Sequence, residues 1–103
     1  MAKILSGQVS LTPGVAVAGA NTGNINSGFY VFFPASNTST YCWIGNNAKT
    51  SSSDVSSSDL FRLAEDKTLF FDGKRVENFN ELWVMGATDA STDGSDVVCW
   101  ITG

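Results

Sequence analysis

The sequence predicts an all-β protein: an antiparallel β-sandwich, jelly-roll-like, with residues 1–103 forming a single small domain. Clusters of Ser, Thr, Asn and Gly interrupt every apolar run, which is typical of many short strands joined by turns. The tripeptide Cys-Trp-Ile occurs at residues 42–44 and again at 99–101, in runs rich in residues that favour a pleated sheet. No segment keeps a helical period, because the best candidate, residues 59–66, is too short.

The first half of the chain predicts four strands. Residues 3–11 alternate loosely and end at a Thr-Pro-Gly turn, and residues 15–18 form a short apolar run before an Asn-rich loop. Residues 29–33 are strongly β-prone, and Pro34 ends this strand or places it near an edge. Residues 40–44 follow a polar turn and contain the first Cys-Trp-Ile copy.

The second half predicts four more strands. A Ser-rich stretch, residues 46–59, reads as a long solvated loop. Residues 61–63 and 68–71 then flank a Glu-Asp turn, and residues 82–85 and 97–101 are expected to form the last pair.

The two Cys-Trp-Ile strands are apolar on both faces. In each, Cys and Ile share one face and Trp takes the other, because side chains alternate along a strand. One face fits a sandwich core, and the other is more apolar than a lone domain needs. Trp43 and Trp100 are therefore candidates for a subunit interface or for a surface beneath a loop. These two tryptophans and Trp83 lie among aliphatic residues in the sequence. This pattern favours a position in the core or in a subunit interface over a carbohydrate-binding surface.

The composition disfavours several classes of partner. The net charge is −4, whereas nucleic acid attracts basic surfaces. No apolar run approaches the ~20 residues of a membrane-spanning helix. The first residues also lack the apolar core of a signal peptide, so synthesis in the cytoplasm is expected.

The sequence shows no catalytic set, so we expect no enzyme activity and no cofactor. Histidine is absent, which removes the commonest general base and metal ligand. No glycine-rich phosphate loop is present. Asp72, Glu77 and Glu81 could supply paired carboxylates, but nothing in the sequence places them together.

Residues 89–94 match the opening spacing of a calcium loop, with a glycine at its sixth position. The twelfth position is Trp100, where a bidentate Glu is needed. We therefore expect a polar hairpin loop and no metal.

Cys42 and Cys99 are expected to be two buried small hydrophobes, with a Cys42–Cys99 bridge as the alternative. Residues 37–39 match a glycosylation sequon, which we interpret as chance.

The order of several segments carries a resemblance. A Tyr-Cys-Trp-Ile-Gly strand at 41–45 is followed by the Ser-rich loop, then by Leu-Ala-Glu-Asp-Lys-Thr-Leu-Phe-Phe at 63–71. Asn-Glu-Leu-Trp-Val-Met-Gly at 80–86 and a closing strand at 94–101 complete the pattern. This order resembles the head decoration (cement) proteins of tailed bacteriophages, most closely from residue 41 onward. The chain departs from the family pattern at residues 65–67. They read Glu-Asp-Lys here, where the family pattern usually has Pro-Gly-Glu.

The resemblance implies a virion protein on the capsid surface that binds the major capsid protein, as a homotrimer, and stabilises contacts between capsomers. A tail, fibre or baseplate subunit and a virion-surface carbohydrate-binding module are the alternatives. Candidate contacts are the N-terminal residues Lys3, Ile4 and Leu5, which could add to a neighbour's sheet edge, and the Ser-rich loop. For Ile4 and Leu5 an ordinary core strand is an equal alternative.

Overall fold

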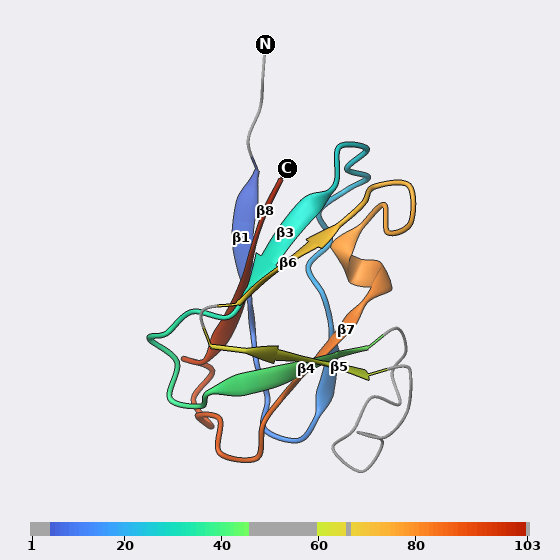
Figure 1. The fold of residues 1–103 in the computed structure, drawn as a ribbon. Coiled ribbons are helices and arrows are strands. Elements are labelled where there is room, and N and C mark those ends of the chain that lie inside the picture. The colour runs from blue at the N-terminus through green and yellow to red at the C-terminus, as the bar shows by residue number, and fades with distance from the viewer. Residues whose placement is uncertain (1–4, 46–59, 66, 103) are drawn as a thin grey trace.

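The protein is an all-β sandwich of two antiparallel four-stranded sheets (Figure 1). The computed structural model describes residues 5–45, 60–65 and 67–102. Among these there is no α-helix and one short 3-10 turn, η2 (Phe79–Glu81). The strands are β1 (Ser6–Ser10), β2 (Ala16–Ala18), β3 (Phe29–Phe32), β4 (Tyr41–Gly45), β5 (Leu60–Ala64), β6 (Thr68–Phe71), β7 (Trp83–Gly86) and β8 (Val97–Thr102).

The strand order is β1-β8-β3-β6 in the first sheet and β2-β7-β4-β5 in the second. The outermost strands in sequence therefore pair with each other, and the next ones inward do the same: β1 with β8, β2 with β7, β3 with β6, and β4 with β5. The predicted sandwich and its eight strands are confirmed. The prediction that residues 82–85 pair with residues 97–101 is wrong, because β7 and β8 lie in different sheets.

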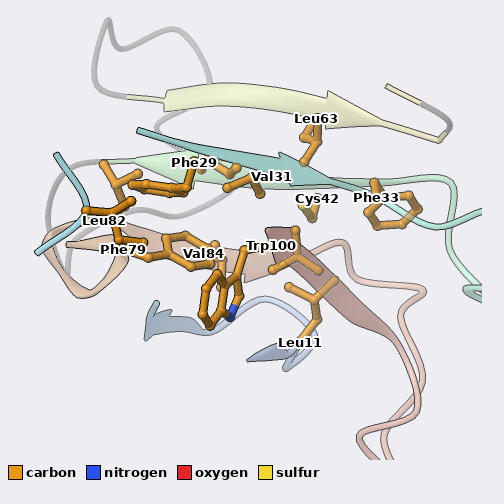
Figure 2. Packing of buried hydrophobic residues seen from close by; sticks show 13 residues of the cluster. Leu11, Phe29, Val31, Phe33, Cys42, Leu63, Phe79, Leu82, Val84 and Trp100 are labelled. Atoms are coloured by element: carbon orange, nitrogen blue, oxygen red, sulfur yellow. The ribbon is translucent and has the colours of Figure 1, made fainter. Parts of the chain in front are cut away.

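The core lies between the sheets and is filled by alternate residues of each strand (Figure 2). Phe29 and Val31 point inward from β3, and Cys42 and Ile44 point inward from β4. The ring of Phe29 contacts those of Phe71 and Phe79, with centroids 5.4 and 5.5 Å apart. Burial of a large aliphatic or aromatic side chain contributes roughly 1.5–3 kcal/mol, so these inward-facing residues supply much of the stability of the fold.

The turn η2, for which the sequence carries no helical period, holds Phe79 in this core. Asn78 begins the turn and accepts a hydrogen bond from the Asn80 N–H, while Glu81 accepts one from the Asn78 N–H. This reciprocal capping box satisfies backbone donors that the turn leaves free. Glu81 is thus a capping residue, and its carboxylate is engaged in the fold.

Candidate functional site

The outer face of the first sheet carries an exposed row of large apolar side chains, here called the outer apolar row: Ile101, Tyr30 and Phe70. The three lie directly opposite one another on neighbouring strands β8, β3 and β6. Their exposed fractions are 37%, 41% and 50%. The rings of Tyr30 and Phe70 are in contact, with centroids 4.9 Å apart and planes tilted by 52°. The row therefore forms one surface feature across three strands.

The row is a consequence of strand alternation. Phe29 and Val31 are fully buried in the core, so Tyr30 between them must face away from it. The same alternation exposes Phe70 between the partly buried Leu69 and Phe71. The four consecutive residues of β3 are all apolar, so the side chains that point outward from this inner strand are apolar as well.

A second, shallower row lies beside the first. Phe32 and Cys99 are opposite each other and half-buried, with Gln8 and Thr68 flanking them on the two edge strands. A hollow of about 420 Å³ opens between β1, β8 and β3 at this point. Its lining residues are Ser6, Gly7, Gln8, Phe32, Cys99, Trp100 and Ile101.

None of the described strand residues on this outer face carries a formal charge, although the whole chain has a net charge of −4. A neutral apolar face binds by removing apolar surface from water and gives no attraction to phosphates or other strongly charged ligands. The face consists of Ser6, Gln8, Ser10, Tyr30, Phe32, Thr68, Phe70, Val97, Cys99 and Ile101.

The outer face of the second sheet has a different character. Trp43 is half-buried and meets the ring of Tyr41 edge-on, at a centroid distance of 5.5 Å. The guanidinium of Arg62 on β5 stacks over the same tyrosine ring, with its Cζ atom 4.3 Å from the centroid. Trp43 lies opposite Met85, which is fully buried although it faces outward from the sheet. This face is therefore partly covered within the chain itself.

The structure separates the two predicted interface tryptophans. Trp43 faces outward from its sheet, whereas Trp100 points inward, is 8% exposed and belongs to the hydrophobic core (Figure 2). We therefore do not include Trp100 in a surface site. Leu5 is 36% exposed, and its backbone carbonyl accepts a hydrogen bond from the Thr102 N–H. Lys3, Ile4 and the Ser-rich loop lie outside the described residues.

Both cysteines are free thiols. Cys42 faces the core from the second sheet, whereas Cys99 faces outward from the first, so their strands are not neighbours and a bridge between them is not formed. Burial raises the pKa of Cys42 to about 12 and also raises the pKa of Cys99. Both are neutral thiols at physiological pH, which makes them poor nucleophiles and poor metal ligands.

Residues 89–94 lie in the connection between the two sheets, so the expected hairpin is a crossing loop. Asp93 accepts a hydrogen bond from the Ser95 N–H, and the hydroxyls of Ser91 and Ser95 are bonded to each other. Hydrogen bonds from Ser95 and Ser91 lower the pKa of Asp93. These contacts form a polar turn. Among the described residues, no group of three or more acidic, Cys or His side chains could hold a metal ion.

The buried carboxylate of Asp96 organises the end of this loop. It accepts hydrogen bonds from the N–H groups of Thr38 (2.7 Å) and Ser39 (3.0 Å) and from the Ser39 hydroxyl (2.8 Å). Burial alone raises its pKa, but the donors of Ser39 and Thr38 outweigh burial and lower the pKa to about 2. Asp96 is therefore a charged structural group that accepts three hydrogen bonds from residues 38 and 39.

Asn37 is held in the same region. Its Nδ2–H donates to the Val97 carbonyl at 2.7 Å, and its Oδ1 accepts from the Val97 N–H at 2.9 Å. The side-chain amide thus binds β8 as a neighbouring strand would, at a point where Pro34 has ended β3. Both polar ends of the sequon asparagine are engaged within the fold.

The site residues that sequence reasoning missed are Tyr30, Phe70 and Ile101. Each was assigned to a strand, but only the pairing of the strands brings them together. No protein-family model matches the chain, and no curated protein or solved structure is significantly similar to it. None of the helical segments described is long and apolar enough to cross a membrane.

Proposed function

We propose that the protein is a structural virion protein, a decoration protein that binds the major capsid protein on the outer surface of a phage head. The observation that carries this proposal is the outer apolar row: Ile101, Tyr30 and Phe70 form an uncharged, exposed apolar surface on the outer face of the first sheet. The described residues contain no competing chemical centre of the kind that metal or thiolate catalysis requires. Adhesion to another protein surface is what this arrangement does best.

The topology supports the proposal. We take the sandwich to be a jelly roll, because the nested pairs β1–β8, β2–β7, β3–β6 and β4–β5 are those of one long hairpin wrapped into two sheets. Eight-stranded jelly rolls are common in viral capsid proteins and in lectins. Fold alone does not define function, so the outer apolar row remains the main argument.

The mechanism we propose is collective adhesion. Burial of apolar surface contributes about 25 cal/mol per Å² to binding. Part of this free energy offsets the translational and rotational entropy that each copy loses when it binds. A face of four short strands therefore gives weak binding for a single copy. Many copies on a repetitive shell, linked in a homo-oligomer, bind far more tightly than one. The resemblance implies a homotrimer for that role.

The location and copy number of the protein in purified virus particles test this proposal. Many copies spread over the head, seen by cryo-electron microscopy and quantified by mass spectrometry, would support a decoration role. A handful of copies at one vertex would instead support the tail, fibre or baseplate alternative. Complete absence from particles would refute both.

A carbohydrate-binding module is the second candidate, and the aromatic clusters Tyr30–Phe70 and Tyr41–Trp43 favour it because aromatic faces stack on sugar rings. A glycan array tests it directly. Binding that is lost in Trp43→Ala places the sugar on the second sheet, and binding lost in Tyr30→Ala places it on the first. Absence of binding to all glycans would eliminate this alternative.

A further inference from the structure

Among the described strands, β1 pairs on one side only, with β8, so its other edge presents backbone hydrogen-bonding groups that no described strand pairs with. The Leu11 N–H donates to the Asp96 carbonyl at 2.8 Å, and the Thr102 N–H donates to the Leu5 carbonyl at 2.9 Å. These bonds bracket the β1–β8 ladder, in which bonded and non-bonded pairs alternate. The backbone groups of residues 7 and 9 therefore face β8. Those of residues 6, 8 and 10 face away from the sheet.

Among the four edge strands described, β1 lacks the usual protection against pairing. Such protection consists of short length, charged side chains or proline at the edge. The edge strand β2 has only three residues and follows Pro13. Arg62 lies within β5, and Lys67 directly precedes β6. In contrast, β1 reads Ser-Gly-Gln-Val-Ser, which is five residues without a charge or a proline.

The outward side chains of β1 are also self-complementary. Ser6, Gln8 and Ser10 share the outer face and read the same in both directions. An antiparallel pair of β1 strands centred on Gln8 therefore places Ser6 opposite Ser10 of the second copy and Gln8 opposite Gln8. Every edge-facing N–H and C=O group of these residues then gains a partner, because they belong to the bonded pairs of the new ladder.

We propose that β1 is a homodimerisation edge, which joins two copies about a two-fold axis through Gln8 into one eight-stranded sheet. On the inner side this register sets Val9 of the second copy beside Gly7, over which the Trp100 indole lies. On the outer side it joins the two uncharged faces into a single surface. The inference does not rest on the proposed function. It implies two-fold symmetry, whereas the resemblance implies a trimer.

The contact is small, since it consists of two five-residue strands. Interfaces below about 1,200 Å² are typical of weak, transient complexes. We expect a dissociation constant on the order of 0.1 mM, so that the dimer forms at high local concentration. The test must therefore span dilute to concentrated protein.

Charge variants at residue 8 test the register. In Gln8→Lys two cations face each other across the axis, and in Gln8→Glu two anions do, so each variant alone should self-associate about fivefold more weakly at low salt. An equimolar mixture should restore association, because opposite charges then meet. Gln8→Ala, which keeps the backbone N–H, is the control and should dimerise like the wild type. Sedimentation equilibrium measures these four samples and the wild type.

Amide hydrogen exchange provides a second readout. Protection of the Gln8 and Ser10 amides should rise with protein concentration, whereas the Gly7 and Val9 amides should be protected at every concentration, because they are bonded to β8. A concentration-dependent dimer with rescue by the mixed variants supports the proposal. A monomer at 1 mM, a trimer, or variants whose association is insensitive to the charge at residue 8 would each overturn it.

Discussion

The indole of Trp100 covers Gly7 on the neighbouring strand. The two residues are directly opposite in the β1–β8 ladder, and a Cβ atom added to Gly7 would lie 2.9 Å from Nε1 of the indole and 3.1 Å from Cε2 and Cζ2. A glycine on an edge strand weakens the sheet, and an aromatic side chain across the ladder compensates by covering the backbone. The pair favours the inward orientation of Trp100 and leaves its Nε1–H buried without a hydrogen-bond partner among the described residues.

We expect Gly7→Ala to destabilise the fold by about 1–3 kcal/mol, because the new methyl group overlaps the indole. Urea denaturation measures the change. Ser6→Ala, one residue away on the outer face, is the matched control and should alter stability little. In a Trp100→Phe background the penalty of Gly7→Ala should shrink. An equal penalty in both backgrounds would mean that the indole is not the source of the strain.

Asp96 makes stability depend on acid pH. Its pKa falls from the ordinary 3.8 to about 2 in the folded protein, so its contribution is complete above pH 3.8 and is lost as the pH falls through 2. A shift of this size corresponds to about 2 kcal/mol. We expect Asp96→Asn to remove this pH dependence and to lower stability at pH 7. Denaturation curves between pH 2 and 7 measure both effects.

Ser39→Ala should have a smaller effect than Asp96→Asn, since it removes one hydroxyl donor to Asp96 and keeps the two backbone donors. It should raise the pKa of Asp96 part of the way towards its ordinary value. An Asp96→Asn protein with the wild-type pH profile would show that this carboxylate does not control acid stability.

The side-chain amide of Asn37 makes two hydrogen bonds to the backbone of Val97, as a neighbouring strand would. Asn37→Ala removes both and should lower the free energy of unfolding by about 1–2 kcal/mol. Asn37→Asp should cost at least as much, because a carboxylate cannot donate to the Val97 carbonyl. Ser36→Ala, at an exposed neighbouring position, is the control. Thermal unfolding compares the three, and an Asn37→Ala protein as stable as the wild type would refute the role.

The cysteines should differ in reactivity. Iodoacetamide should modify the half-buried Cys99 slowly in the native protein and Cys42 only after unfolding, because Cys42 is fully buried and its pKa is raised to about 12. Peptide mapping by mass spectrometry distinguishes the two sites. A Cys42–Cys99 disulfide in the native protein, or equal rates of modification, would contradict the structure.

The sequence predicted the strands because alternation and turn residues act locally. The β-prone runs between polar clusters predict strands at residues 29–33 and 97–101, and both strands occur close to these bounds. Which strands pair was not predictable in the same way. The outer apolar row unites residues from β3, β6 and β8, and no local pattern shows that these strands are neighbours.

The twin Cys-Trp-Ile strands show a second limit. In β4 the tripeptide directs Cys42 and Ile44 to the core and Trp43 outward, whereas in β8 it directs Trp100 inward and its neighbours outward. Both faces of such a run are apolar, so composition cannot choose between them. In β8, Gly7 lies opposite Trp100 and leaves space for the indole on the inner face, which favours the inward orientation of Trp100.

The attachment of face variants to virus particles is the decisive experiment for the proposed role as a decoration protein. Tyr30→Ser/Phe70→Ser removes the two aromatic members of the outer apolar row, and Phe61→Ser removes an equally exposed phenylalanine of the other sheet (52% against 50% for Phe70). Each folded protein is added to particles that lack the wild-type chain, and bound copies are counted after gradient purification. We predict that the Phe61 variant binds like the wild type and that the double variant loses at least tenfold in bound copies. Wild-type binding by the double variant would contradict the assignment of this face as the attachment surface.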